Sequence, residues 1–306
     1  MALTLLEAAK SARSAEELAV IRELSEGDLL SVIPFRNISG SGVHFRREES
    51  LAGVGFRHLN AGLNEEYGQT SQASEALKFF GGDISVDRAI IETQGEEARA
   101  YQVQSKIRAM RMSWERVFIK GTEAASNGLE FDGLEKRCGV QGQTSQAIQN
   151  PAGGLSLGAL DELIDEVDAQ GAQPMLIMSK EMRRRLTQAS RDGVLNGGIQ
   201  ISTDEFGRQR YQYNDAKILV VDRDEENNVI LGANEPGGTS SIYCVAFGDL
   251  LTAGIQNGGI SVRDLGESHD RPAMLTRVEW YTGLVVYNGR SVARLHGIDP
   301  SAAAQL

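Results

Sequence analysis

Residues 95–120 limit what this chain can fold into more than any other stretch does. Their apolar side chains recur three or four positions apart, which predicts a buried stripe along one helix; they are Val103, Ile107, Met110, Trp114, Val117 and Phe118. The bases fall largely off this stripe and are Arg99, Lys106, Arg108, Arg111 and Arg116. Acids precede the stripe and Gly121 follows it, as helix ends favour. We predict an amphipathic spine helix, about 39 Å long, against which other elements pack.

The composition is that of a folded, water-soluble chain. Of its 306 residues, 41% are hydrophobic and 24% are charged. No apolar run approaches the roughly 18 residues of a membrane span, and residues 1–19 lack the hydrophobic middle of a signal peptide. Cys138 and Cys244 belong to no CxxC or histidine cluster, which favours buried thiols over a disulfide or a metal site.

The charge is unevenly distributed along the chain. The net charge of −11 argues against a protein whose main task is to wrap nucleic acid. Residues 94–120 carry six bases and three acids, whereas residues 156–275 carry eleven bases and nineteen acids. The spine helix is therefore the basic part of the chain. A sequence-specific DNA-binding protein is disfavoured by this charge and by the lack of a recognisable motif.

An extended hairpin is predicted before the spine helix. Pro34 forbids helix and biases the residue before it toward β structure. Strand-like pieces follow at 43–47 and 52–57, and alternation places Val43 and Phe45 on one face with His44 and Arg46 on the other. Because a two-stranded ribbon is marginal by itself in water, this hairpin must rest on something else.

The rest of the chain predicts helices and then mainly strands. Residues 141–154 are rich in Gln, Gly, Ser and Pro and predict a boundary between two lobes. A helix begins near Ser156 and another covers 180–191, with a buried strand at 174–178. Later strands are predicted at 199–202, 209–213, 216–221, 229–231, 241–247, 260–262, 275–281, 284–287 and 291–295. Asn288-Gly289 predicts a tight hairpin between the last two. Segregated helices and mainly antiparallel strands indicate an α+β fold.

No catalytic constellation emerges from the motifs. Residues 154–158 match the GxSxG pattern of hydrolases, which requires a hydrophobic strand immediately before the serine. Residues 149–153 supply no such strand, so Ser156 is predicted to cap the following helix. Nucleotide-binding, zinc-protease and calcium-loop motifs are missing, and the acidic run 222–226 reads as an exposed loop. We expect no catalytic residue, metal or cofactor; a serine hydrolase using Ser156 is the alternative from another class.

Short segments, in the same order, resemble the major capsid proteins of tailed bacteriophages of the Hong Kong 97 type. The first is Ser31-Val32-Ile33-Pro34-Phe35-Arg36-Asn37-Ile38-Ser39-Gly40, and Phe45-Arg46-Arg47-Glu48 follows it. The others are residues 54–57, 75–77, 81–88, 118–121, 131–134, 277–280 and 290–295. The resemblance spans residues 3–298, and its order and spacing make the combination specific.

The resemblance implies a Hong Kong 97-type α+β capsid fold. Its expected parts are an N-terminal arm (1–33), an extended β-hairpin loop (34–70), a peripheral domain with the spine helix (71–155), an axial domain (156–270), and a return to the peripheral domain with a C-terminal tail (271–306). The implied function is a structural one, that of a major capsid protein whose hexamers and pentamers build an icosahedral head around double-stranded DNA. An encapsulin-like nanocompartment, a shell that stores cargo enzyme, is the alternative within this fold.

The resemblance also implies partners and contact residues. The partners are other copies of the chain, the portal protein, packaged DNA and any separate scaffolding or decoration protein, in a virion assembled in the bacterial cytoplasm without a membrane. Contacts between subunits are expected at Arg36, Phe45, Arg46, Arg47, Phe56 and Arg57. Bases facing the interior are expected at Arg99, Lys106, Arg108 and Arg111, with pairing inside the subunit as the alternative.

Two further expectations concern maturation. Some members of this family weld their shells by attack of an extended-loop lysine on a neighbouring asparagine, which needs a neutral amine. No lysine occurs between Lys10 and Lys78, and arginine stays protonated, so we expect a shell without covalent cross-links. Because about 33 residues precede the hairpin, too few for an ordinary domain, we expect neither a fused scaffolding segment nor a maturation cut there.

Overall fold

The computed structural model describes residues 27, 29–50, 52–59, 62, 65–138, 146–151, 153–191, 199–203 and 209–305. Most of the expected N-terminal arm lies outside these residues. The end of the arm, from Leu29 to Ile33, enters the hydrophobic core, where Leu29, Leu30 and Ile33 are buried. Within the described chain, no helix is long and apolar enough to cross a membrane.

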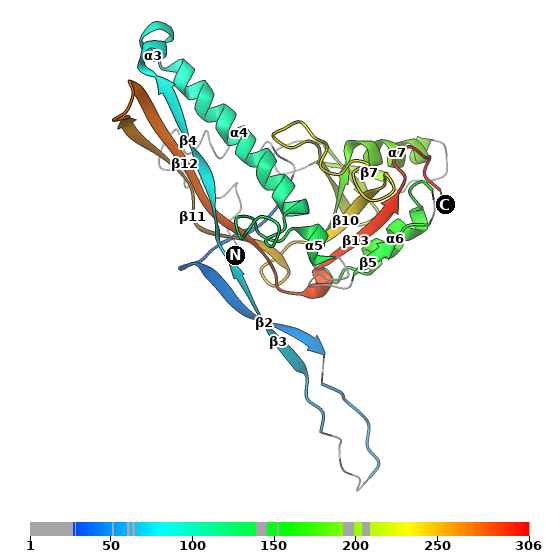
Figure 1. Cartoon of the computed structure of the whole chain (residues 1–306). Coiled ribbons are helices and arrows are strands. Elements are labelled where there is room, and N and C mark those ends of the chain that lie inside the picture. Colours follow the sequence, from blue (N-terminus) through cyan, green and yellow to red (C-terminus); the bar gives the residue numbers. More distant parts are fainter. Residues whose placement is uncertain are drawn as a thin grey trace.

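The spine helix packs on a four-stranded sheet and lies beside its strands β4 and β12 (Figure 1). It is α4, Glu97–Lys120, and follows the short α3, Arg88–Gln94. The sheet has the order β1-β11-β12-β4, in which only the β1–β11 pair is parallel. Its strands are β1 (Phe35–Asn37), β4 (Lys78–Asp87), β11 (Thr252–Glu267) and β12 (Ala273–Val286). The predicted long helix is thus confirmed.

A second, seven-stranded sheet forms the other half of the body, with the order β5-β13-β10-β6-β9-β8-β7. Its strands are β5 (Ala147–Gln149), β6 (Pro174–Ser179), β7 (Ile199–Thr203), β8 (Gln209–Tyr213), β9 (Ala216–Val221), β10 (Ser240–Ala246) and β13 (Val292–Ile298). Helices α6, Leu157–Asp165, and α7, Lys180–Arg191, pack on this sheet (Figure 1). The short α5, Leu134–Arg137, lies near the junction of the two halves.

A hairpin projects from the body as a two-stranded ribbon, as predicted, but residues 52–57, which were predicted to be strand-like, form no strand (Figure 1). Its strands are β2, Gly42–Ser50, and β3, Gln69–Ala76. Alternation along β2 is confirmed: Val43, Phe45 and Arg47 are half-buried, whereas His44 and Arg46 are exposed. One face of the ribbon therefore lies toward the body and the other toward solvent.

An aromatic cluster holds the spine helix on its sheet. Trp114 stacks on Phe118 at 5.3 Å and on Trp280 of β12 at 5.7 Å between ring centroids. Phe35 of β1 packs at 5.3 Å from Trp280. The indole N–H of Trp114 donates to Thr282 at 3.2 Å, so the buried polar atom is satisfied. The predicted apolar stripe is thus the face that packs on the sheet.

Gly121 ends the spine helix for a reason other than the one expected. Its φ of −57° is an ordinary value, so no left-handed turn requires glycine here. A Cβ at this position would instead lie 2.5 Å from the carbonyl oxygens of Phe131 and Val117. Gly121 is therefore needed for the close approach of the following loop to the last turn of the helix.

Strand pairing differs from the expected division into domains. The axial domain was expected to cover 156–270, but β11 lies in the four-stranded sheet beneath the spine helix. Residues 271–306 were expected to return to the peripheral domain; β12 does lie in the sheet beneath the spine helix, whereas β13 lies between β5 and β10 in the other sheet. Periodicity predicts that a segment is a strand, but its sheet is decided by distant partners.

The prediction of a tight hairpin at Asn288-Gly289 was wrong. The two strands predicted at 275–281 and 284–287 are the single strand β12, and the segment before β13 is a short 3₁₀ turn, Gly289–Ser291. Because β12 and β13 belong to different sheets, they do not pair. Asn288 instead accepts a hydrogen bond from the backbone N–H of Arg290 at 3.0 Å. Residues 229–231 also form no strand, and Val229 makes only an isolated bridge to Arg223.

Candidate assembly surface

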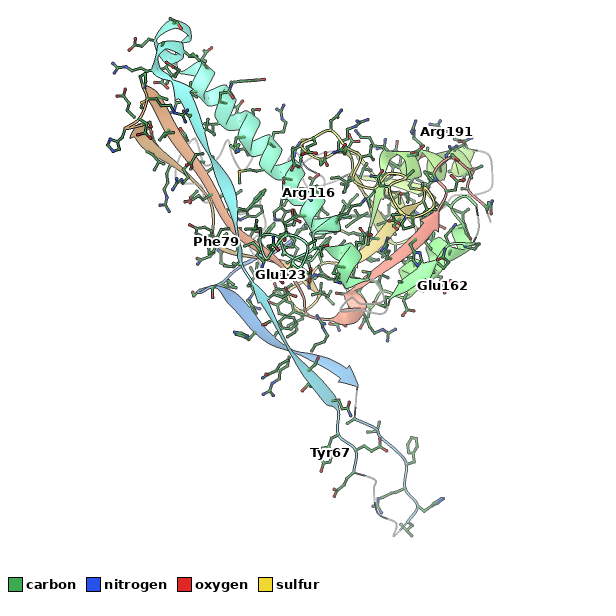
Figure 2. All side chains as sticks on the ribbon, viewed as in Figure 1. Tyr67, Phe79, Arg116, Glu123, Glu162 and Arg191 are labelled. Carbon is green, nitrogen blue, oxygen red and sulfur yellow. The ribbon has the colours of Figure 1, made fainter. Side chains whose placement is uncertain are left out.

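The tip of the hairpin exposes apolar side chains far from the body of the chain. Phe56 has a relative exposure of 111%, and Val54, Leu59 and Tyr67 are also highly exposed. Figure 2 shows Tyr67 on the distal part of the ribbon, well away from the rest of the subunit. Exposed apolar groups on a projecting element are typical of a surface that another molecule covers.

The base of the hairpin is different, because its inner face contacts the chain's own body. The ring of Phe45 packs edge-on against Tyr287, with centroids 5.0 Å apart. Arg47 donates to the carbonyl oxygen of Val286, and its guanidinium lies 5.6 Å from the Phe45 ring. Phe45 and Arg47 were expected to contact an adjacent subunit, but here they have partners inside the same subunit.

The other expected contact residues remain available to solvent. Arg36 is exposed and lies 3.5 Å from the Tyr287 hydroxyl, at the limit of a hydrogen bond. Arg46 points away from the body, and Phe56 and Arg57 lie exposed in the tip. Four of the six residues are therefore placed where a second subunit can reach them.

The bases of the spine helix are not one uniform surface. Arg99 faces the sheet, where it binds Asp264 at 2.8 Å and the hydroxyl of Thr276 at 2.8 and 3.1 Å. Lys106 lies over Gly82, whose missing side chain leaves room for it. Arg108 is exposed and Arg111 is half-buried. For Arg99 the structure fits the alternative of pairing inside the subunit rather than the expected interior-facing role, because Asp264 of the sheet lies on the helix side.

Sequence reasoning missed an aromatic pair, an exposed Phe79 with a half-buried Tyr281, on the sheet face opposite the spine helix. Phe79 has a relative exposure of 82% and packs edge-on against Tyr281, with centroids 5.2 Å apart. A shallow hollow beside them is lined by Gly81, Asp83 and Arg277. The alternation of β4 could have found this feature, since Phe79 shares its face with Gly81, Asp83 and Ser85.

Ser156 is a structural residue, as predicted. Its hydroxyl accepts a hydrogen bond from the backbone N–H of Ala159 at 3.3 Å, which is the N-cap geometry of α6. The residue is buried, and its own N–H donates to the Asn150 side chain at 3.1 Å. This geometry gives no support to a hydrolase based on Ser156.

Both cysteines are buried thiols outside any disulfide, as predicted. Burial raises the pKa of Cys244 to about 12, so its thiol stays protonated. Among the described residues, no group of three or more His, Cys, Asp or Glu side chains is arranged to hold a metal ion.

Comparison with solved structures identifies the fold. The SrpI encapsulin of Synechococcus elongatus PCC 7942 superposes with a TM-score of 0.68 at 14% identity, covering 100% of this chain and 99% of that one. The capsid of an empty GTA particle gives 0.62 at 12% identity, covering 89% and 90%. Mycobacterium phage Bobi gives 0.62 at 14% identity, covering 92% and 91%. No model of a known protein family matches the sequence, and no curated protein matches it.

These likenesses extend over nearly the whole chain and join phage capsids with encapsulins. The chain therefore has the Hong Kong 97-type capsid fold, an α+β fold, as its sequence predicted.

Proposed function

We propose that this chain is the major capsid protein of a tailed bacteriophage, a shell subunit that assembles with copies of itself into an icosahedral head around double-stranded DNA. One observation carries the proposal: a hairpin projects from a capsid fold and leaves Val54, Phe56, Leu59 and Tyr67 exposed at its tip. Nothing in its own subunit covers this tip among the described residues. A second copy is the partner that such a fold supplies.

The energy available at the tip is large enough to matter in a shell. Complete burial of one Phe side chain stabilises by about 1.5–3 kcal/mol. A contact between a tip on one subunit and a different surface on the next is heterologous, and such contacts close into rings when the rotation fits. Because each subunit in a ring gives and receives the contact, a modest gain is multiplied over the shell.

The spine helix supplies the contact with nucleic acid in this proposal. Arg99 binds Asp264, whereas Arg108 is exposed on this helix and Lys106 and Arg111 are half-buried along it, and these three bases would face the packaged genome. A few bases per subunit, repeated over the shell, screen phosphate charge without reading sequence. The further partners are the portal protein and any separate scaffolding or decoration protein, in a virion assembled in the host cytoplasm.

An encapsulin-like nanocompartment is the second candidate. It is favoured by the SrpI encapsulin, whose TM-score of 0.68 exceeds the 0.62 of the phage Bobi structure and whose superposition covers 100% of this chain. Both candidates need a closed shell of this subunit. They differ in the content of that shell, which is DNA in one and protein cargo in the other.

Cryo-electron microscopy of particles purified from the cells that produce the protein tests both candidates. The phage proposal predicts tailed heads whose ultraviolet absorbance is dominated by nuclease-protected double-stranded DNA. Closed, tailless shells that contain protein and no DNA would establish the nanocompartment instead. A subunit that stays monomeric in those cells would overturn both.

A further inference from the structure

The hairpin leaves the body through a narrow joint. On one side, the chain passes from β3 to β4 across the single buried residue Leu77. On the other side, residues 38–41 connect β1 to β2 and include Gly40 with φ of +118°. A hydrogen bond of 2.8 Å from the Leu77 N–H to the Ser41 carbonyl joins these two connections. With so little backbone between ribbon and sheet, side chains at the joint decide the direction in which the ribbon points.

One side chain at this joint connects three separate parts of the chain. Arg137 of α5 has a relative exposure of 0%, and its guanidinium donates to Glu75 of β3 at 2.7 Å. It also donates to the carbonyl oxygens of Asp132 at 2.8 Å and Leu284 of β12 at 3.2 Å. A planar guanidinium fixes the relative positions of its acceptors more tightly than a lysine ammonium does. Arg137 thus ties the ribbon to the sheet and to the loop before α5.

The remaining joint contacts lie on the same face of the ribbon as Glu75. In the β2–β3 register, Glu75 is opposite Val43 and Ala73 is opposite Phe45. Directly opposed residues share a face, so Glu75, Phe45 and Arg47 all lie toward the body. Phe45 and Arg47 contact Tyr287 and Val286, which follow Leu284 along the chain. Among the described residues, these contacts hold the ribbon on one face, where Val43 and Phe45 also pack against an apolar cluster and Arg137 is fully buried.

We propose that the buried Arg137–Glu75 ion pair sets the direction of the hairpin in the free subunit, so that its apolar tip is presented at a fixed angle to another subunit. The second part rests on the proposed function, whereas the first concerns one subunit alone. Breaking a buried pair by removing one charge leaves the other charge uncompensated. Loss of the Glu75 charge should therefore loosen the joint without changing the tip.

Distance measurements between two spin labels on the unassembled subunit test the proposal. One label is attached through His58→Cys in the exposed tip and the other through Gln104→Cys on the exposed side of α4. Cys138 and Cys244 are buried and do not compete for the label. With the Arg137–Glu75 ion pair intact, we expect a single narrow distribution of distances between the two labels. In Glu75→Gln, we expect this distribution to broaden, or its centre to shift, by several times its native width. The same narrow distribution in both proteins overturns the proposal.

A matched variant separates this effect from the general loss of an ion pair. Arg116 binds Glu130 at 2.7 Å, the same distance, but this pair does not touch the hairpin. Glu130→Gln should keep the narrow distribution, and equal broadening in both variants would overturn a specific role for Arg137. If Glu75→Gln does not fold, the double variant Arg137→Met with Glu75→Leu replaces the pair by apolar groups, as buried pairs often tolerate. A folded double variant should show the broad distribution, and a narrow one would overturn the proposal.

Assembly into particles is measured in a separate experiment from the label distances. If the native subunit forms no particles, the proposed function fails while the label distances still decide the role of Arg137.

Discussion

Arg277 on β12 binds Asp83 on β4 through two hydrogen bonds of 2.6 and 2.7 Å, and the two residues are directly opposed in the strand pairing. The pair lies on the exposed face of the sheet, beside the hollow next to Phe79. The Arg277 hydrogen bond, together with the charges of Arg277 and Lys106, holds the pKa of Asp83 below its ordinary value of 3.8. The pair therefore links two surface strands by charge.

This linkage makes a prediction about pH. A carboxyl whose pKa is lowered by folding stabilises the protein above its unfolded pKa, and this contribution is lost as pH falls through the lower, folded pKa. We expect the Asp83 carboxyl to titrate below 3.8 when followed by NMR, and to return toward that value in Arg277→Gln. Because the pair is exposed, added salt should shrink the shift. An Asp83 that titrates identically in both proteins would contradict this prediction.

Removal of the tip aromatic should separate folding from assembly. Because Phe56 is fully exposed in the free subunit, Phe56→Ala should change the free energy of unfolding by no more than about 0.5 kcal/mol. Particle yield, measured by sedimentation, should fall strongly. Leu129→Ala is the control, since Leu129 is also an exposed apolar residue but lies in the loop after α4. Native particle yield from Phe56→Ala would remove the tip from the assembly contact.

The aromatic cluster predicts the opposite behaviour for a buried residue of the spine helix. Phe118 is fully buried between Trp114 and Phe247, so Phe118→Ala should destabilise the subunit by about 3–5 kcal/mol. Chemical denaturation followed by tryptophan fluorescence measures this loss. Tyr101→Ala on the exposed side of the same helix should cost under about 0.5 kcal/mol. Similar losses for both variants would mean that Phe118 does not contribute core packing.

Two glycine substitutions should have opposite signs. Gly121→Ala places a methyl group 2.5 Å from two carbonyl oxygens, and overpacking of this kind costs about 1–3 kcal/mol. Gly158 lies inside α6 with no contact closer than 3.9 Å, so Gly158→Ala should stabilise by up to about 1 kcal/mol. Thermal unfolding followed by circular dichroism compares the two. A rise in Tm for Gly121→Ala would contradict the close approach seen at the end of the spine helix.

Mature particles should contain no covalent cross-links between subunits. The hairpin has no lysine, and the next one, Lys78, binds Glu123 at 2.6 Å and the Gly128 carbonyl at 2.9 Å near the foot of the ribbon. No primary amine is therefore placed on the loop that would have to reach another subunit. Denaturing electrophoresis should give one band near 33.2 kDa. A ladder of heavier bands that survives boiling and reductant would show that a different amine carries out the cross-linking.

Local features of the fold could be predicted from the sequence because they depend on neighbouring residues. The apolar stripe through Trp114 predicted α4, and the alternation around Phe45 predicted that Val43 and Phe45 share one face of the hairpin, opposite His44 and Arg46. The Ser156 cap followed from one residue type in front of one apolar run. Each of these patterns is complete within a short window of sequence.

Features that depend on distant partners could not be predicted in this way. Arg99 lies off the apolar stripe like the other bases of α4, and its contact with the sheet depends on the position of Asp264 on β11. No local sequence pattern predicts the role of Arg137, since its partner Glu75 is 62 residues away. Asn288-Gly289 resembles a hairpin turn locally, but β12 and β13 pair with strands of different sheets. The contacts that join the hairpin to the body could therefore be identified only from the structure.

Two of the three connections between the sheets, β10–β11 and β12–β13, lie side by side. The chain leaves the seven-stranded sheet after β10, forms β11 and β12 in the other sheet, and returns to β13, the neighbour of β10. At this crossing the buried hydroxyls of Thr252 and Ser291 are hydrogen-bonded at 2.9 Å. A single proteolytic cut in either connection would leave the other one intact. A subunit nicked there would keep both halves in place, and neither half can be obtained as one continuous fragment of the chain.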